Sequence, residues 1–511
     1  MKQKILSYGI ALCATGVAQA IELPEIIGND MVLQQQQKNA KLWGWAKPGN
    51  YVTITTGWNK ECYQVKTDDS GRWELGIATP TASFDKHELT FREFTSTPKK
   101  GSKPIDEKKV EGVLIGEVWF CSGQSNMEMP LGGFWNCPVE GANETILKSQ
   151  QYRNAIRVAT IEHQGTETPQ TRVKGKWEVA EPKCASRFSA CAYFFATTLT
   201  DALQVPVGVI NCSWGGSCVE GWLPKDTLLT YHDGLIPITP TDYHRKMVMF
   251  NGMLAPLAGY TIKGFLWNQG ESNVGRTEEY VQRFSTMTRL WRKLWNQPGD
   301  HLPIYTVELP PYRYGIATET AGAEFRATQH RIARELEYCG CVCTSDLMYE
   351  HEIDQIHGCK KKEIGERLAW LALTRDYGME GLAAEAPEFE YMEWVEASEG
   401  DKAVIAGSTV DTNHAATGKV LRLYFSNSKD GFDRMSGIQG FEAQDADGNW
   451  HPAIVWSSSA WQNVKRQGCF LALVCPGVAD IKNVRYCYRN FVIGQLHNLR
   501  GLPVVPFTTE K

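Results

Sequence analysis

The sequence predicts an α/β core with a β-rich region on each side. In residues 111–384, short apolar runs typical of strands alternate with helical patterns. The flanking regions instead show short alternating runs separated by turn residues. Strands that alternate with helices indicate a mostly parallel sheet with helices on both sides, and closely spaced short strands indicate sandwich-like β domains. The length of 511 residues also suits several domains.

The first twenty residues are typical of a signal peptide. Lys2 and Lys4 give a positive start, residues 5–17 are apolar, and residues 18–20 read Ala-Gln-Ala, a typical cleavage site. No later stretch reaches the roughly 18 apolar residues that a membrane helix needs. We therefore expect residues 1–20 to be cleaved and the protein to be secreted or periplasmic, with no membrane span.

Composition narrows the possible partners and the redox chemistry. The formal net charge is −5 and the basic residues do not gather in runs, so we expect no nucleic-acid partner. Of fifteen cysteines, Cys13 lies in the leader, which leaves fourteen. An even number in an exported protein permits disulfides, and we expect some bridges without assigning partners. No pair of CxxC units supports a zinc site, and the oligomeric state stays open.

The two β-rich regions are residues 21–110 and 385–511. In the first, an alternating run at 51–55 lies between turn residues at 47–50 and 68–71. In the second, strand-like runs such as 419–425 are joined by turns such as Asp447-Gly448-Asn449. We expect a small β-sandwich at the C-terminal end.

The core region contains five expected strands and four expected helices. The strands are 117–122, 205–212, 262–267, 304–309 and 339–345, and the helices are 188–203, 277–297, 322–337 and 360–376. The last helix places Ile364, Leu368 and Leu371 on one face. Active sites of such sheets lie at the carboxyl ends of the strands, so the polar clusters that follow the strands are the candidates for chemistry.

The first cluster, residues 121–127, contains Ser125. A serine on a sharp turn after a strand can present its hydroxyl outside the sheet, and Gly123 permits tight backbone geometry just before it. Met127 stands where the G-x-S-x-G elbow would have its second glycine. Taken alone, this cluster also fits a structural turn.

The second and third clusters could stabilise an oxyanion. Gly215 and Gly216 could turn backbone N–H groups toward developing negative charge, although they could also serve only the chain turn. After the next strand, a side-chain amide of Gln269 or Asn268 could donate a further hydrogen bond. The neighbouring Glu271 could be catalytic, but acidic residues after strands more often hold loops together.

The fourth cluster, Asp354 to His357, could activate a serine. A hydroxyl becomes a good nucleophile when a base takes its proton, and histidine titrates near neutrality. Asp354, three residues earlier, could orient the ring. His357 could instead cap a helix or pack in a core. A metal site from His351, Glu352, Asp354 and His357 would lack the H-E-x-x-H spacing.

The order of the four clusters resembles the SGNH (GDSL) hydrolase superfamily. The sequence is similar to that of the sialate O-acetylesterase family in five stretches: Gly123–Met127, Ser213–Ser217, Trp267–Asn273, Ile356–His357 and Lys361–Ala369. Residues 23–34 and 499–507 are similar to the ends of exported bacterial members. The resemblance covers nearly the whole mature chain. It implies a three-layer SGNH core between N-terminal and C-terminal β domains.

The resemblance also implies roles for individual residues. Ser125 would be the nucleophile and His357 the base, and the oxyanion hole would use the N–H of Ser125, an N–H of Gly215 or Gly216, and the Gln269 side chain. The possible substrate contacts are Gln124, Asn126, Trp214, Asn268 and Glu271.

The acid is where this chain departs from its relatives. Many relatives place it two residues before the histidine, where this chain has Gln355, and Gly358 replaces their proline. We expect Asp354 to orient His357, with Asp346 as the reserve.

The activity implied is hydrolysis of O-acetyl esters of sialic acids through an acyl-enzyme, without cofactor or metal. An acetylesterase acting on plant polysaccharides such as xylan or pectin is the alternative within the same chemistry. A catalytically inactive sugar-binding protein is the alternative of another class.

Overall fold

The computed structural model describes residues 20–59, 61–231, 247–297, 301–407, 418–433, 437–457 and 470–510. Apart from residue 20, the expected signal peptide lies outside the described residues, as do Cys13 and Cys469. Within the described residues, no helix combines the length and the apolar character that crossing a membrane requires.

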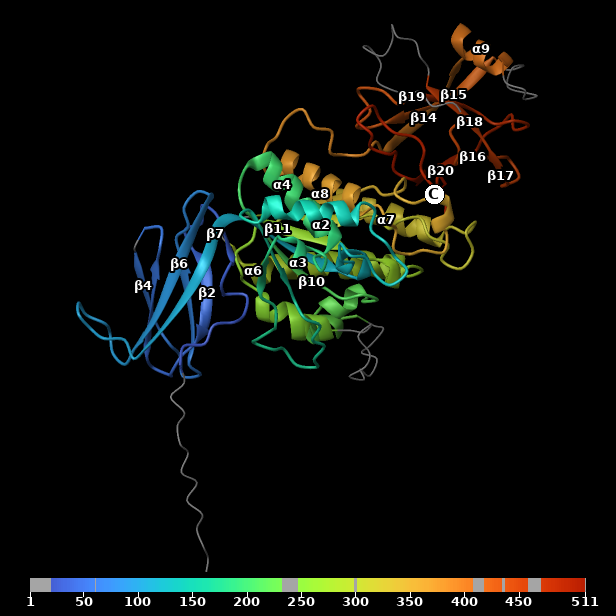
Figure 1. Cartoon of the computed structure of the whole chain (residues 1–511). Coiled ribbons are helices and arrows are strands. Elements are labelled where there is room, and N and C mark those ends of the chain that lie inside the picture. The colour runs from blue at the N-terminus through green and yellow to red at the C-terminus, as the bar shows by residue number, and fades with distance from the viewer. Residues whose placement is uncertain are drawn as a thin grey trace, which may run out of the picture.

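A large mixed sheet lies at the centre of the molecule (Figure 1). Its main path runs β13-β12-β11-β7-β10-β8-β9, and every neighbouring pair is parallel except β8 and β9. The strands of this path are β7 (Asp106–Gly123), β8 (Ile156–Thr160), β9 (Trp177–Val179), β10 (Val207–Ser213), β11 (Gly264–Asn268), β12 (Ile304–Val307) and β13 (Cys339–Val342). The α/β core expected from the alternation of strands and helices is confirmed.

Helices connect these strands and cover the sheet. The α-helices are α1 (Ser125–Glu128), α2 (Ala142–Lys148), α3 (Pro182–Ala185), α4 (Ala190–Leu203), α5 (Lys225–Leu228), α6 (Thr277–Trp295), α7 (Ala321–Glu335), α8 (Lys361–Arg375) and α9 (Glu399–Gly407). Short turns of other helix types are η1 (Ser149–Tyr152), η2 (Val219–Trp222), η3 (Phe250–Leu254), η4 (Ala255–Leu257), η5 (Glu271–Asn273) and η6 (Glu350–Glu352). The four long helices expected from the sequence correspond to α4, α6, α7 and α8.

Two hydrophobic clusters meet at β7, because successive side chains of a strand point to opposite faces. Phe120 packs into the cluster that contains Trp291 and Trp295 of α6. Trp119, one residue earlier, packs into the cluster that contains Phe195 of α4. Helix α8 packs against α4 on this second face. The strand is therefore buried from both sides and holds its carboxyl end in a fixed place.

The N-terminal β region shares a strand with the core. Its strands are β1 (Val32–Gln34), β2 (Ala40–Trp45), β3 (Tyr51–Thr56), β4 (Cys62–Lys66), β5 (Arg72–Ile77) and β6 (Ser83–Phe94). The first part of β7 pairs antiparallel with β6, and its later part pairs with β10 and β11. One 18-residue strand thus runs from the N-terminal region into the central sheet, across the expected boundary at residues 110 and 111.

The C-terminal region forms two four-stranded antiparallel sheets around their own hydrophobic cluster. The strands are β14 (Phe389–Glu396), β15 (Lys419–Phe425), β16 (Phe441–Gln444), β17 (Trp450–Pro452), β18 (Ile454–Ser457), β19 (Phe470–Val474), β20 (Asn483–Tyr486) and β21 (Phe507–Thr508). Buried Arg326 of α7 donates to the carbonyl of Arg489, and Asn490 donates to the carbonyls of Arg313 and Ile316. These bonds attach the region to the core.

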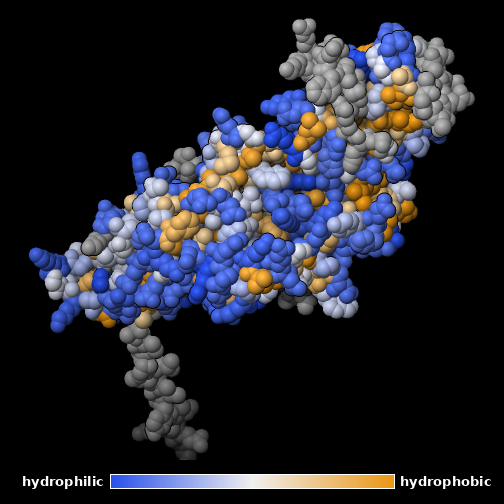
Figure 2. Space-filling view, turned by 45° about the horizontal axis from the view of Figure 1, so that its top comes forward, coloured by the Kyte–Doolittle hydropathy of each residue, from blue (hydrophilic) through white to orange (hydrophobic). Residues whose placement is uncertain are grey.

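The cysteines and the surface complete the description. All thirteen cysteines of the described residues are free thiols, so the expected bridges are not found there. Most are buried, where burial raises the pKa of thiols such as Cys339 to about 12 and leaves them unreactive. The face shown in Figure 2 is mostly hydrophilic, with hydrophobic side chains in small separate groups.

Candidate active site

The nucleophile candidate lies at the carboxyl end of β7. The strand ends at Gly123, which has a φ of 135° that glycine adopts readily and other residues rarely do. A Cβ at this position would lie only 2.2 Å from the carbonyl oxygen of Asn268, so the site requires glycine. The chain then turns into the short helix α1, which begins at Ser125. Nε2 of His357 lies 2.8 Å from Oγ of Ser125. The structure therefore brings together two residues that are 232 positions apart in the sequence.

The surroundings of His357 keep its ring neutral. Burial, followed by the positive charge of Lys361, lowers the pKa of His357 to about 4, although Glu128 opposes the shift. The rings of Phe134 and His357 pack in a T-shaped arrangement with their centroids 5.4 Å apart, and Nδ1 lies 3.6 Å from Sγ of Cys137. A neutral imidazole hydrogen-bonded to a hydroxyl is in the state that can accept the hydroxyl proton.

The structure does not bring either expected acid to His357. Asp354 is mostly exposed and forms an ion pair with Arg313, with 2.9 Å between Oδ1 and Nη2. Asp346 accepts two hydrogen bonds of 2.7 Å from Arg367 and lies 3.2 Å from Nε2 of His497. These partners hold the pKa of Asp346 at about 2 although the side chain is buried. Within the described residues, neither carboxylate bonds to the imidazole, so the expected Asp354–His357 contact is absent.

The expected oxyanion groups are only partly available. Backbone N–H of Ser125 has no hydrogen-bond acceptor within the described residues. The N–H of Gly215 donates to the carboxylate of Glu128. Gly216 has a φ of 73° and accepts from the hydroxyl of Ser272 through its carbonyl. Gly215 therefore lies beside the nucleophile, as expected, but its N–H already has an acceptor.

Gln269 is placed differently from the expectation. Its side chain is fully buried, and its amide nitrogen donates to Asn273 at 2.7 Å, to the carbonyl of Ser217 at 3.1 Å and to Gln124 at 3.2 Å. An amide has two N–H groups, so these acceptors use its donors fully. In this structure Gln269 joins the loops after three strands and does not point an N–H at Ser125.

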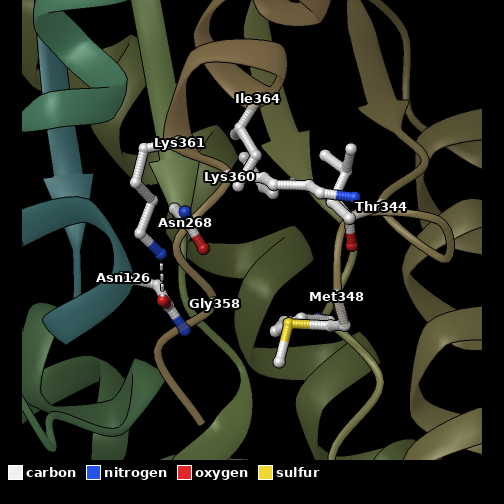
Figure 3. Close-up of a pocket in the computed structure, with 11 residues that line it drawn as sticks. Asn126, Asn268, Thr344, Met348, Gly358, Lys360, Lys361 and Ile364 are labelled. Atoms are coloured by element: carbon white, nitrogen blue, oxygen red, sulfur yellow. Dashed lines mark hydrogen bonds between the residues drawn. The ribbon is translucent and has the colours of Figure 1, made fainter. Parts of the chain in front are cut away.

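Behind Ser125 lies a buried polar network centred on Asn126. The Asn126 amide nitrogen donates to the Glu271 carboxylate and, at 3.1 Å, to the carbonyl of Ile356, which precedes His357. Its amide oxygen accepts from the ammonium of Lys361 at 2.6 Å (Figure 3). Burial raises the pKa of Glu271 and lowers that of Lys361.

Four of the five expected substrate contacts are therefore internal. Asn126 and Glu271 belong to the network, and Gln124 and Asn268 are nearly fully buried, with the N–H of Gln124 donating to the carbonyl of Asn268 at 3.0 Å. Trp214 alone is partly exposed, and its ring stacks on His163 with centroids 4.3 Å apart.

Other residues near Ser125 and His357 were not singled out from the sequence. Oε1 of Glu128 lies 3.0 Å from Nε2 of His163. Next to His357, Phe134 and Cys137 pair as a tight hairpin whose tip carries Trp135, with 89% of its surface exposed. The sequence signal that could have indicated this hairpin is the run Gly-Gly-Phe-Trp-Asn shortly after the nucleophile, because it places a tryptophan among turn residues.

A cluster of possible metal ligands lies elsewhere. Within the described residues, Glu308, His330 and Cys343 are the set whose ligand atoms lie within 4.8 Å of one another. Glu308 and His330 are buried and bond directly, with 2.6 Å between Oε2 and Nε2, so each satisfies the other. The set considered from the sequence around His357 does not gather: His351 stacks on Tyr349, and Glu352 accepts from the N–H groups of Tyr349 and Cys359.

Comparisons with known proteins match this region to carbohydrate esterases. A model of the family described as carbohydrate esterase, sialic acid-specific acetylesterase, matches residues 115–374. The sialate O-acetylesterase of Homo sapiens is 30% identical over 285 residues, which cover 53% of each protein. The chain thus spans about half the length of that relative. The Mus musculus enzyme is 25% identical over 414 residues, 71% of this chain and 74% of its own.

A solved structure matches nearly the whole chain. The crystal structure of a carbohydrate acetylesterase from Xanthomonas citri superposes with a TM-score of 0.78 and 25% identity. The match covers 96% of this chain and all of that protein. The likeness therefore extends to the β regions on both sides of the core.

The positions of the two aspartates give a first prediction. Asp354→Asn should change kcat by less than about threefold, because Asp354 pairs with Arg313 and does not contact His357. Loss of a true triad aspartate would instead lower kcat by about 10⁴. Asp346→Asn should lower the free energy of unfolding by roughly 3–5 kcal/mol, because it leaves Arg367 buried without its charged partner. Ester hydrolysis and urea unfolding measure both. A thousandfold loss of kcat in folded Asp354→Asn would contradict this prediction and show that Asp354 orients His357.

The environment of His357 gives a second prediction, on pH. The ring must be neutral to act as a base, so activity is lost as the pH falls through its pKa. The value of about 4 places the acid limb of kcat/KM near pH 4, well below the ordinary histidine range of about 6.5. The pH profile of kcat/KM measures this, with circular dichroism confirming folding at each pH. A limb at pH 6.5 or above would contradict the burial argument.

Proposed function

The chain belongs to the carbohydrate esterase family of sialic acid-specific acetylesterases, and from this premise we propose that it hydrolyses O-acetyl esters of sugars, with O-acetylated sialic acids as the first candidate substrates. The observation that carries the proposal is the 2.8 Å contact between Ser125 Oγ and His357 Nε2, at the carboxyl end of β7 and inside the matched region. An inactive sugar-binding protein would have no use for a neutral, half-buried imidazole hydrogen-bonded to a strand-end serine.

The proposed reaction is acyl transfer through a Ser-His dyad. His357 takes the proton of Ser125 while the oxygen attacks the acetyl carbonyl. The tetrahedral intermediate collapses, the C–O bond to the sugar breaks, and His357 gives its proton to the leaving sugar hydroxyl. Water, deprotonated by the same imidazole, then attacks the acetyl-serine. The bond between the acyl carbon and Ser125 Oγ breaks, His357 returns its proton to Oγ, and acetate leaves.

Two backbone N–H groups are the proposed oxyanion donors, those of Ser125 and Gly215. The first belongs to the nucleophile itself, and Gly215 lies beside that residue, since a Cβ on Gly215 would be 3.3 Å from the Ser125 Cβ. Donors fixed in place before the reaction stabilise developing charge without reorganisation. The buried amide of Gln269 has a supporting role in this account, because it joins the loops that carry these donors.

Plant polysaccharides with acetyl groups are the second candidate substrates. Sialic acids carry a carboxylate, and the carboxylate of Glu128 lies beside the nucleophile, where it would repel a second negative charge. The match of nearly the whole chain to a carbohydrate acetylesterase supports a wider substrate range. Trp135 is exposed in the loop that follows the nucleophile, and Trp214 is partly exposed next to Gly215, so both could offer apolar surface to a sugar ring.

We propose the following organisation of the chain around this site. Residues 1–20 act as a cleaved signal peptide, which makes the enzyme secreted or periplasmic. Residues 111–384 form a three-layer SGNH core, between β domains at 21–110 and 385–511. No metal or cofactor enters the proposed reaction.

Acetate release tests the proposed function and yields a third prediction. The wild type should release acetate from p-nitrophenyl acetate and from at least one member of a panel of O-acetylated sialic acids and acetylated xylan. Ser125→Ala should lose on the order of 10⁶ in kcat, because it removes the nucleophile. If Ser125→Ala keeps a tenth of the wild-type rate or more, Ser125 is not the nucleophile. A wild type with no hydrolysis above background would favour the sugar-binding alternative.

Trp135 gives a fourth prediction, on sugar binding. Trp135→Ala should raise KM for an acetylated sugar about fivefold, which corresponds to about 1 kcal/mol of lost contact. It should leave kcat/KM for p-nitrophenyl acetate within twofold, because the hairpin pairing of Phe134 and Cys137 does not use the indole. Phe84→Ala, an exposed aromatic on β6, is the matched control. Equal effects on both substrates would mean that Trp135 acts on the site's structure.

A further inference from the structure

A carboxylate of the protein itself occupies one of the proposed oxyanion donors. The N–H of Gly215 donates to Oε2 of Glu128. A Cβ built on Gly215 would lie 3.2 Å from this oxygen and 3.3 Å from the Cβ of Ser125. The Glu128 carboxylate is therefore next to the nucleophile, at the N–H to which an acetyl oxygen would bind.

The local fold holds Glu128 there. Ser125 and Glu128 are the first and last residues of α1, and residues three apart lie on the same side of a helix. The second carboxylate oxygen is 3.0 Å from Nε2 of His163, whose ring stacks on Trp214. Trp214 immediately precedes Gly215. Glu128 thus contacts the loop that carries the donor and a side chain packed on that loop.

The carboxylate is a chemical analogue of the reaction's own groups. It has the charge and shape of the product acetate, and hydrogen bonds to a charged acceptor are about twice as strong as those to a neutral one. An acetyl ester is neutral before attack, so its carbonyl oxygen is the weaker acceptor for this N–H.

We propose that Glu128 competes with the acetyl group for the Gly215 N–H, so that substrate and product acetate bind only to molecules in which the carboxylate has left that amide. The inference rests on the proposed esterase function. Glu128 then sets the apparent affinity for the acetyl group, because affinity falls by the fraction of molecules that are competent to bind. At saturating substrate the acetyl group holds the amide, and kcat is unaffected.

Glu128→Gln tests the competition, because it keeps the shape and removes the charge. We expect kcat/KM for p-nitrophenyl acetate to rise about three- to tenfold, since a neutral amide oxygen holds the Gly215 N–H less tightly. We expect kcat to stay within twofold and the inhibition constant of sodium acetate to fall by the same factor as KM. A residue that only supports the fold would not produce this split between KM and kcat.

Glu162→Gln is the matched control for charge. Glu162 is exposed, precedes His163 and lies 3.9 Å from Lys174, so the variant removes one negative charge nearby without touching Gly215. It should leave kcat/KM for the neutral ester unchanged. If Glu128→Gln tightens acetate inhibition without raising kcat/KM for the neutral ester, long-range repulsion explains the result and the proposal is overturned.

Other outcomes separate this proposal from the proposed function. A tenfold loss of kcat in folded Glu128→Gln, with an unchanged unfolding midpoint, would overturn the competition and make Glu128 part of the reaction. Should the Gln variant fail to fold, Glu128→Ala carries the same expectations. A wild type that hydrolyses no acetate ester refutes the function instead. Calorimetric titration of sodium acetate into wild type and Glu128→Gln still tests the competition, and equal affinities would refute it.

Discussion

The active-site geometry depends on the hydrogen bonds of one buried side chain, Asn126. Its carboxamide bonds to Glu271 after β11, to the carbonyl before His357, and to Lys361 at the start of α8. The nucleophile is the adjacent residue. Since a buried polar group left unpaired costs about 1–3 kcal/mol, the three segments are most stable in the arrangement that satisfies all of these bonds. That arrangement also places the base on the nucleophile.

The same network explains why the base can be neutral without a carboxylate partner. Lys361 brings a positive charge close to His357 and is itself held by Asn126. Burial and this charge disfavour the imidazolium form. Packing and hydrogen bonds hold His357 in place: the Phe134 ring packs against the imidazole, Cys137 lies near Nδ1, and the Gln355 side chain accepts from the backbone N–H. Orientation in this site therefore comes from sterics and hydrogen bonds, where a triad would use an ion pair.

The sequence predicted those parts of the site that strand order dictates. Polar clusters after parallel strands must meet at one sheet edge, so Ser125, Gly215 and His357 could be brought together from pattern alone. It did not predict side-chain partners that depend on distant segments. Asp354 is near His357 in the chain, yet its partner is Arg313 from another loop. The amide of Gln269 was expected to face the substrate, but Asn273 and Ser217 take its hydrogens. Glu128 and Trp135 carried no periodic signal at all.

The most direct test of the central claim is to locate the activated serine by covalent labelling. A fluorophosphonate reacts with a serine whose hydroxyl is deprotonated by a neighbouring base, and peptide mass spectrometry identifies the residue that carries the label. The account predicts that label on Ser125 in the wild type, and no label there in folded His357→Ala. Equal labelling of His357→Ala, or a label on a serine other than Ser125, would contradict the dyad on which the account depends.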